Sequence, residues 1–508
     1  MSAVHTASGF HFSFIGVRLL DIIPDVSLNL NMETRSIFLN ISPLDHRYSI
    51  SEKTVFDALS PWLSEEASIS ACVHAEIALV AAHLKTRGAW TNEIKKQLDD
   101  AARSVQPGEV YAEEEKTKHN IRALVNVLKK KIPPAIAPLV HLGATSVDIL
   151  DTSLSYRMKG AAQTVVLPLL AGLERHLCDF AEKEADTPQV GRTHGQHAVP
   201  ITLGFAISEY VSRLGKSILE IKRLSGNLKG KLAGAVGAYN ATSMITGDPE
   251  ELERLYLDEL GLQPSEHSTQ LVEPEYLLRL LLEFNTAFGI IANLADDLRH
   301  LQRSEISELH EGFGEDQVGS STMPQKRNPW NSEHVKSLWK TFMPRVVTFY
   351  MDQISEHQRD LSNSASQRFT ADYTAGFCMA VYRMTGVIEG LRPDREKALK
   401  NLLGSSGGVM AEPAYILLAE SGVSDAHEVI RRITLRAEKE NLSFAAALSL
   451  EGEALRRITV KMAELGIIQN NNSEAALGFF NHPERYCGIA SKKAKTIAAK
   501  YKKAMETI

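Results

Sequence analysis

The sequence predicts an all-α protein organised around a central bundle of long helices. Residues 275–302 have apolar side chains on most helical faces, a pattern that a helix tolerates only when neighbouring helices surround it. Ile218, Ile221, Leu224 and Leu228 have the spacing of a single helical stripe. Residues 153–184 and 333–351 also have the character of long helices, and strand-like alternation is rare. Because one chain cannot cover so many apolar faces, we expect the bundle to be shared between subunits.

Clusters of proline and glycine divide this helical chain. Pro133-Pro134 and Pro138 form a first break, and Pro393 with the glycines of residues 404–408 forms a second. We therefore predict three helical domains: an N-terminal domain, residues 35–143, a central bundle, residues 144–395, and a C-terminal domain, residues 396–508. Residues 1–34 are expected to form an extension of unknown role, within which Met32 is an alternative start.

The composition argues against several classes of protein. Charged residues make up 23% of the 508 residues and hydrophobic residues 44%, as in ordinary soluble globular proteins. The net charge of −6 argues against a nucleic-acid-binding surface. No run approaches the roughly 18 uncharged apolar residues of a membrane helix, and charges interrupt the apolar residues 10–23, which makes them a poor secretory signal. The four cysteines lack CxxC spacing, so they indicate neither a disulfide framework nor a zinc site and fit a reducing cytoplasm.

The most distinctive segment is GSSTMPQKRNP, residues 319–329. It follows Gly312 and Gly314, so a mobile loop over residues 312–329 is expected. Two hydroxyl groups, loop amides and Lys326 can together remove a proton and stabilise a negative charge. Its composition alone also fits a surface turn, although the order GSSxMPxKxNP is far rarer than its composition.

Five polar islands interrupt the predicted helices. They are residues 47–49 (RYS), His119 on a charged helix, residues 141–148 (HLGATSVD), residues 191–200 (GRTHGQHAVP) and residues 359–368 (RDLSNSASQR). The first suits a phosphate but is also typical of a helix-entry loop. The third can cap a helix or bind a carboxylate. The two arginines of the last resemble an anion cradle, with exposed surface charges as the alternative.

His194 and His197 are three residues apart, the spacing of a possible metal pair. No carboxylate or cysteine accompanies them, so we predict no metal site. A histidine between small flexible residues is better suited to be a general acid or base, because imidazole titrates near neutral pH.

Together these segments resemble the adenylosuccinate lyase family of the fumarase/aspartase superfamily over roughly residues 43–430. The residues GSSxMPxKxNP match the superfamily signature, which also fits fumarase, aspartase, argininosuccinate lyase and carboxymuconate cycloisomerase. Arg47-Tyr48, the HLGATS, GRTHGQ and RDxSxS segments, GAVGAYN at residues 234–240 and Ser268-Thr269-Gln270 are similar to the nucleotide-binding family. Gln325, Gln367 and residues 271–274 (LVEP) depart from its usual pattern.

The resemblance implies a role for each matching residue. Ser320 would be the general base and His194 the general acid, with His119 assisting, and Lys326 and Asn328 would bind the carboxylate whose charge grows. Glu333 would orient this constellation. Substrate would be held by the remaining matched positions: Arg47, Tyr48, His141, Thr145, Ser146, Thr193, Gln270, Ser321, Met323, Arg359, Ser364 and Arg368.

The implied reaction is anti-elimination of fumarate from adenylosuccinate, giving AMP, and from succinylaminoimidazole carboxamide ribotide in purine nucleotide biosynthesis. Argininosuccinate lyase or another fumarate-releasing relative is the alternative, and a helical protein that lost activity is a third reading. Three arginines, Arg47, Arg359 and Arg368, favour a phosphorylated substrate, because a dicarboxylate alone needs fewer cations. No metal or organic cofactor is expected, since protein groups can hold the dianion. The resemblance also implies a homotetramer whose active sites are shared between three subunits.

Overall fold

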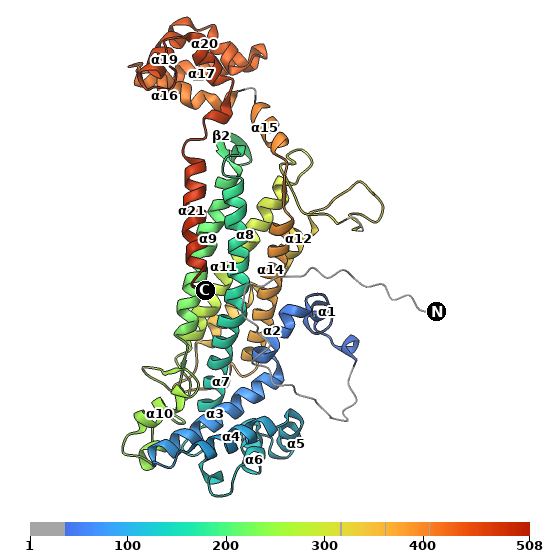
Figure 1. Ribbon diagram of the computed structural model, residues 1–508, viewed down its shortest axis with the longest axis vertical. Helices are drawn as coiled ribbons and strands as arrows, with labels where there is room; N and C mark the ends of the chain where they lie inside the picture. Colours follow the sequence, from blue (N-terminus) through green and yellow to red (C-terminus); the bar gives the residue numbers. More distant parts are fainter. Residues whose placement is uncertain (1–35, 315–316, 361, 406) are drawn as a thin grey trace.

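The computed structural model describes residues 36–314, 317–360, 362–405 and 407–508. The protein is an elongated assembly of helices, with one group of helices at each end of a central bundle (Figure 1). Helices account for 67% of the chain and strands are few and short, which confirms the predicted all-α class.

Six helices lead into the bundle: α1 (Arg47–Ser51), α2 (Lys53–Leu63), α3 (Glu65–Thr86), α4 (Asn92–Ser104), α5 (Pro107–Thr117) and α6 (Asn120–Lys129). The Ser64 side chain caps α3 by accepting the Ala67 amide, and Thr91 caps α4 in the same way. Helix α3 has an alanine-rich buried face that packs with α4, α6 and α10 (Pro249–Asp258) in one apolar cluster. This cluster positions His119 and His141 at its surface.

The central bundle consists of long helices: α7 (Ser146–Ala161), α8 (Leu167–Lys183), α9 (Leu203–Gly226), α11 (Glu275–Leu301), α12 (Trp330–Phe342), α13 (Arg345–Asp352) and α14 (Thr370–Gly390). A π-helical turn, Ala162–Val166, joins α7 to α8. Pro168 explains the turn, because it has no N–H to donate to the carbonyl of Thr164. In the core, the rings of Phe284 and Phe377 stack with centroids 5.4 Å apart.

The predicted helices agree with the bundle except at two places. The segment 275–302 forms α11, and residues 153–184 lie in α7, the π-helical turn and α8, with their last residue just beyond α8. The single helix expected over residues 333–351 is wrong, because α12 ends at Phe342 and α13 begins at Arg345. Pro344 between them lacks the amide hydrogen that a continuous helix needs. Leu228 also lies beyond the end of α9, although it is buried.

Within the described residues, three two-stranded sheets accompany the helices. Strands β1 (Pro188–Thr193) and β2 (Gln196–Thr202) form an antiparallel hairpin. Strand β3 (Lys229–Gly230) pairs in parallel with β4 (Gln263–Pro264), and β5 (Leu309–His310) pairs antiparallel with β6 (Arg392–Pro393). Each sheet joins segments that lie at an end or an edge of the bundle.

The last part of the chain forms a second helical group and then returns to the bundle. The helices are α15 (Arg395–Leu403), α16 (Ala411–Glu420), α17 (Ala426–Glu440), α18 (Phe444–Ser449), α19 (Gly452–Glu464), α20 (Ser473–Phe480) and α21 (Ala490–Met505). Helices α16–α20 share an apolar cluster of their own. Helix α21 instead packs on α8 and α9, where Ala498, Tyr501 and Met505 join the core of the bundle.

The packing of α21 bears on the predicted domains, whose boundaries at residues 143 and 395 remain predictions. The break at Pro393 and residues 404–408 placed this helix in the predicted C-terminal domain, with its lysines expected on a solvated face. Its buried stripe consists of Ala490, Ala494, Ala498, Tyr501 and Met505. Three of these five side chains are small alanines, so the stripe is inconspicuous in the sequence. Lys502 pairs with Asp179 of α8 at 2.7 Å, so part of the basic face is also used against the bundle.

The expectation that no stretch is apolar enough to span a membrane was too strong. Among the described residues, Lys53–Thr86 and Glu275–Leu301 are long and apolar enough by length and composition. However, 78% and 56% of their most apolar windows are buried inside the protein. More than half of each apolar window is therefore packed inside the protein.

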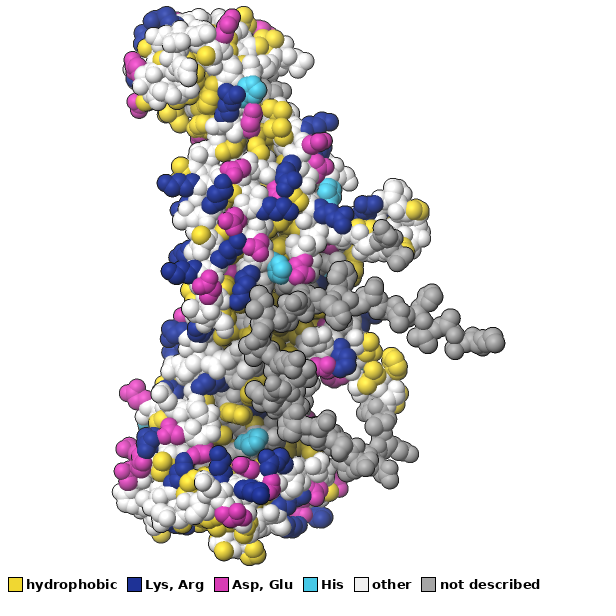
Figure 2. Space-filling view, viewed as in Figure 1, with side chains coloured by type: hydrophobic (Ala, Val, Ile, Leu, Met, Phe, Trp, Pro, Cys, Tyr) yellow, Lys and Arg dark blue, Asp and Glu magenta, His cyan; other side chains and the backbone are white. Residues whose placement is uncertain are grey.

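The surface of the bundle is mixed in charge. On the face seen in Figure 2, basic and acidic side chains are interspersed along the bundle. A set of large apolar side chains on and just after α13 is exposed: Val347 (60%), Tyr350 (48%), Met351 (66%) and Ile354 (72%). Such a local apolar group on a bundle helix is typical of an interaction surface.

Candidate active site

The segment GSSTMPQKRNP forms an exposed loop that projects beside α12 (Figure 1). Ser320 is partly buried, and its Oγ accepts hydrogen bonds from the amides of Met323 (3.1 Å) and Thr322 (3.4 Å). Asn328 Nδ2 donates to the carbonyl of Gly319 at 3.1 Å. A Cβ at Gly319 would lie 2.2 Å from the carbonyl oxygen of Lys326, so only glycine permits this close approach. The loop therefore brings Ser320, Lys326 and Asn328 near one another.

Glu311 fastens the two ends of this loop together. Its carboxylate accepts hydrogen bonds from the amides of Asn331 (3.3 Å) and Ser332 (2.8 Å), in the first turn of α12. A carboxylate is favoured there, because the first amides of a helix have no partner within the helix. Glu333 lies in the same turn and is exposed, as are Ser321, Met323 and Lys326 in the loop.

A second group of predicted residues meets at the start of α7. Thr145 is the N-cap of this helix in a capping box, and its amide donates to Asp148 Oδ2 at 2.8 Å. Ser146 Oγ lies 3.5 Å from His119 Nε2. The prediction that His119 lies on a helix was wrong, because it is the N-cap of α6 and its Nδ1 accepts the Arg122 amide. The imidazole replaces the usual hydroxyl or carboxylate cap.

Asp148 joins this group to the glycine-rich segment after α9. Its carboxylate forms a fully buried ion pair with Lys231 and accepts the amides of Ala233 (3.2 Å) and Gly234. His141, in turn, lies with its Nδ1 2.7 Å from Glu76 Oε1 of α3. The turn before α7 is therefore held from two sides by buried carboxylates.

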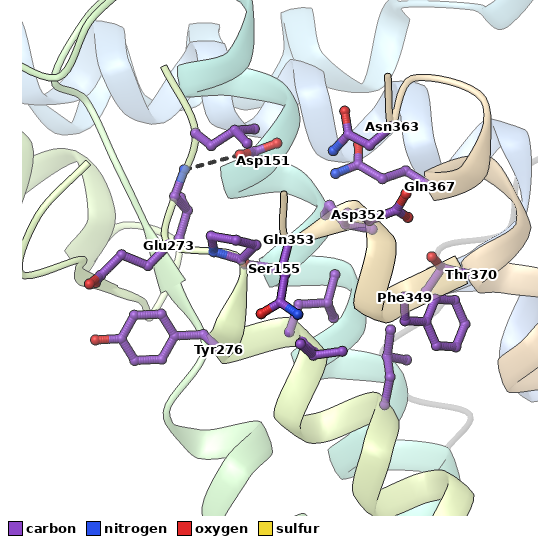
Figure 3. A pocket seen from close by; sticks show the side chains of 17 residues that line it. Asp151, Ser155, Glu273, Tyr276, Phe349, Asp352, Gln353, Asn363, Gln367 and Thr370 are labelled. Atoms are coloured by element: carbon purple, nitrogen blue, oxygen red, sulfur yellow. Dashed lines mark hydrogen bonds between the residues drawn. The ribbon is translucent and has the colours of Figure 1, made fainter. Parts of the chain in front are cut away.

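A third group lies beside α7, one turn further along. The amide of Gln270 donates to the carbonyl of Gln358 at 3.2 Å, next to Arg359. Figure 3 shows Asp151 accepting the Val272 amide, at 3.1 Å. Burial raises the pKa of Asp151 to about 6, an effect that the Val272 amide and the charge of Arg359 oppose.

Asp151 and Val272 line a hollow of about 630 Å³, including its open mouth. Leucines line it together with Asp151, Asp352, Gln353, Asn363 and Gln367, which Figure 3 shows around it. Arg359 donates to Asn363 Oδ1, while its buried Nε has no hydrogen-bond partner among the described residues. Ser364 and Arg368 are exposed in the same segment.

Arg47 and Tyr48 begin α1 and face the start of α12. Tyr48 Oη lies 2.9 Å from His334 Nε2. Burial and the nearby charges of Arg383 and Arg47 lower the pKa of His334. Arg383 also donates to Glu52 Oε1 at 2.8 Å, so the chain before the bundle is tied to α14.

His194 lies at the tip of the β1–β2 hairpin. His194 (φ 55°) and Gly195 (φ 73°) are both left-handed, as a two-residue hairpin turn of this hand requires. Thr193, His194 and His197 are exposed. Arg192, which pairs with His197 next to the turn, forms a two-pronged ion pair with Glu308, which is fully buried. The hairpin is therefore anchored just before its exposed tip.

Within one chain, the predicted residues form separate groups. The β2 hairpin lies at one end of the bundle and α6 at the other, with α1 between them (Figure 1). The structure brings together His119 with Ser146, and Gln270 with the segment of Arg359, but it joins neither pair to His194 or Ser320. Sequence reasoning missed Glu76, Lys231, Asp151, Glu311 and His334. None of these five residues has a local sequence signal, whereas the nearby Asp148 has one, the Thr-x-x-Asp pattern of a capping box.

Comparisons with known proteins cover most of this chain. A family model described as "Lyase" matches residues 46–341, and one described as "Adenylosuccinate lyase C-terminal" matches residues 355–463. The adenylosuccinate lyase of Pyrococcus abyssi is 32% identical over 427 residues, which cover 82% of this chain and 92% of that protein. The chain belongs to the adenylosuccinate lyase family. A second member, from Archaeoglobus fulgidus, is 29% identical over 90% of this chain and 98% of its own length.

Solved structures support the fold of this lyase. The 3-carboxy-cis,cis-muconate lactonizing enzyme of Pseudomonas putida superposes with a TM-score of 0.74 at 24% identity, over 88% of this chain and 97% of that one. A fumarate lyase from Mesorhizobium sp. BNC1 gives a TM-score of 0.73 at 21% identity, over 87% and 97%. The adenylosuccinate lyase family therefore shares its helical-bundle architecture with these proteins.

Proposed function

We propose that this member of the adenylosuccinate lyase family eliminates fumarate from adenylosuccinate, giving AMP, and from succinylaminoimidazole carboxamide ribotide in purine nucleotide biosynthesis. The observation that supports it most is the family match over most of the chain, within which the signature loop and the arginine segments lie. The C-terminal family model favours this reaction over the alternative, argininosuccinate cleavage.

In this proposal, Ser320 removes the proton next to the substrate carboxylate. A serine hydroxyl is a poor base in water, but the Met323 and Thr322 amides already donate to Ser320 Oγ and would stabilise its alkoxide. Loop closure would exclude water and bring Lys326 and Asn328 to the carboxylate, where negative charge grows as the carbanion forms. Glu333 would orient the loop from the first turn of α12.

His194 is the proposed general acid that protonates the departing nitrogen, with His119 assisting. The exposed hairpin tip gives His194 access to a ligand, and Thr193 lies beside it. His141, Thr145, Ser146 and Gln270 would hold the rest of the substrate around the start of α7, with Ser321 and Met323 of the signature loop. No step in this scheme requires a metal or an organic cofactor.

Arg47, Tyr48, Arg359, Ser364 and Arg368 are the proposed phosphate and ribose contacts. Arg359 is partly buried, and its Nε has no hydrogen-bond partner among the described residues, so it retains a donor for an anion. Guanidinium groups bind phosphate through two parallel hydrogen bonds, which suits a nucleotide better than a dicarboxylate alone.

We further propose that the chain forms a homotetramer in the cytoplasm, with each active site built from three subunits. Two features support assembly. The proposed residues lie in separate groups along one chain, and α13 exposes Val347, Tyr350 and Met351 on the bundle. Sharing of sites predicts complementation: a mixture of Ser320→Ala and His119→Ala chains, refolded together, regains part of the activity that each lacks. Failure to regain activity in confirmed mixed tetramers would contradict shared sites.

The function is tested by offering adenylosuccinate and argininosuccinate separately to the purified chain and measuring fumarate. Release from adenylosuccinate alone is expected. Release from argininosuccinate alone would overturn the nucleotide assignment, and no release from either would overturn both. Ser320→Ala and His194→Ala should each nearly abolish turnover with the fold intact, and Arg359→Ala should mainly weaken substrate binding.

A further inference from the structure

A buried carboxylate, Glu76, contacts one of the proposed substrate-binding histidines. It lies in the middle of α3, and its side chain is 0% exposed. Its Oε1 is 2.7 Å from His141 Nδ1, while its Oε2 is buried without a hydrogen-bond partner among the described residues. Burying a charge is costly unless it is paired, so the contact with His141 is the interaction that offsets this cost.

The contact holds a turn that the backbone alone would not favour. His141 has a left-handed conformation (φ 63°), which is unfavourable for residues other than glycine. His83, on the same face of α3 two turns after Glu76, has its Nε2 2.8 Å from the carbonyl oxygen of Leu142. Helix α3 thus fixes residues 141 and 142 through two side chains. This turn leads directly into Thr145 and Ser146.

The geometry also decides which nitrogen of His141 is available. With Nδ1 donating to Glu76, Nε2 is the ring atom left for a ligand, and it has no hydrogen-bond partner among the described residues. The imidazole ring is 24% exposed, so it is reachable, whereas the carboxylate behind it is not. The Glu76 carboxylate accepts the Nδ1–H and so fixes the orientation of the ring.

The other titratable groups around the pair do not provide a second negative charge for His141. They are Cys72 and His83 on α3, Tyr256 on α10, and Asp148 on α7. Burial raises the pKa of Cys72 to about 11 and that of Tyr256 well above its ordinary value, and it lowers the pKa of His83. These three groups are therefore neutral at pH 7. The Asp148 carboxylate is paired with Lys231.

We propose that Glu76 is a positioning residue for the lyase reaction, which orients the ring of His141 so that Nε2 faces and binds an anionic oxygen of the substrate. The inference rests on the proposed function. It assigns the recognised group by its chemistry, a carboxylate or phosphate oxygen, and it makes His141 a binding group and not a base.

Replacing Glu76 with glutamine removes the charge and retains the shape. The amide oxygen is a weaker acceptor for the Nδ1–H of His141, so KM is expected to rise about 10-fold or more while kcat changes little. His141→Gln should raise KM by a similar factor, and adding Glu76→Gln to it should raise KM no further. A merely structural role of Glu76 would raise KM further in the His141→Gln background, and that result overturns the proposal. Glu76→Asp, which retains the carboxylate, should bind substrate more tightly than Glu76→Gln.

Glu174→Gln provides the matched control, because Glu174 is equally buried but lies in α8 of the bundle. It should leave KM unchanged. Product inhibition separates the two anions: Glu76→Gln should weaken fumarate if His141 binds a carboxylate, or AMP if it binds the phosphate. Equal affinities for both products in the variant and the wild type count against the proposal.

Product binding, which needs no turnover, separates this inference from the proposed function. Fumarate and AMP are titrated by calorimetry into the wild type, Glu76→Gln and His141→Gln. Both variants should bind the same product more weakly, by a similar factor. If Glu76→Gln does not fold, Glu76→Asp takes its place, and wild-type affinity for both products in His141→Gln refutes the proposal. Absence of fumarate release with this pattern of product binding would refute only the reaction.

Discussion

Replacing Asp148 with asparagine is expected to destabilise the protein by about 3–5 kcal/mol, because it leaves the buried ammonium of Lys231 without a counter-charge. Both side chains are 0% exposed. After the replacement, Lys231 Nζ retains only the carbonyl of Gly234, 3.1 Å away. The asparagine amide would also face some of the N–H donors that the carboxylate now accepts, from Thr145, Ala233 and Gly234.

The reverse replacement, Lys231→Met, should cost less. The Asp148 carboxylate would still accept three backbone amides, which stabilise its charge. The double variant should be less destabilised than the two single variants added together, because it has no unpaired buried charge. Free energies of unfolding are measured from urea denaturation, followed by circular dichroism at one protein concentration.

The control is the pair of Lys53 and Asp57, which has the same chemistry but is 73% and 61% exposed. Lys53→Met should change stability by less than about 0.5 kcal/mol. A loss of under about 1 kcal/mol in Asp148→Asn would refute the reasoning, since it would mean that the pair is hydrated or that Lys231 is neutral. Additive effects in the double variant would show that the two side chains are not coupled.

Three further replacements test the packing and the buried carboxylates. Gly204→Ala would place a Cβ 2.2 Å from the carbonyl oxygen of Ala181 and should lower the melting temperature by several degrees. Gly172→Ala, whose Cβ would have no atom within 4 Å, should instead stabilise its helix by about 0.5–1 kcal/mol. Equal effects of the two variants in calorimetry would contradict this prediction. Because the pKa of Asp151 is raised to about 6, its contribution to stability is full below pH 4 and is lost as the pH rises through 6. Asp151→Asn should therefore leave the urea midpoint unchanged at pH 4 and raise the stability by up to about 3 kcal/mol at pH 8. A difference in stability between variant and wild type that is the same at both pH values would exclude this titration. Glu174 is fully buried, and neither of its carboxylate oxygens has a hydrogen-bond partner among the described residues. Burial also raises its pKa, so Glu174→Met should increase the stability by about 1–3 kcal/mol. A lower melting temperature of the variant would imply that Glu174 has a partner that this structure does not contain.

The long helices were predictable because many residues contribute to each pattern. The segment 275–302 matched α11 closely, since its apolar residues repeat over many turns. One residue was enough to spoil the prediction over residues 333–351, where Pro344 breaks the helix. The lysine-rich α21 hid its packing stripe because alanines make up most of it.

The candidate site shows the same contrast. Ser320, His194 and Lys326 stood out because they lie in short polar segments between apolar helices. Glu76 did not, because it is a single carboxylate in an alanine-rich helix and its partner is 65 residues away. Glu311 likewise acts on amides 20 residues further along the chain. Contacts of this kind depend on the tertiary fold and have no local pattern.

The position of α21 has a consequence for how the chain folds during synthesis. Arg175 of α8 donates to the carbonyl of Met505, 330 residues later, and Tyr501 fills the space left by Gly215 of α9. The faces of α8 and α9 that α21 covers therefore stay open until residues 490–505 have left the ribosome. Helices α16–α20 share a separate apolar cluster and can pack before this closure. Loss of residues 490–508 would consequently expose the middle of the bundle, which is formed by segments about 300 residues earlier in the sequence.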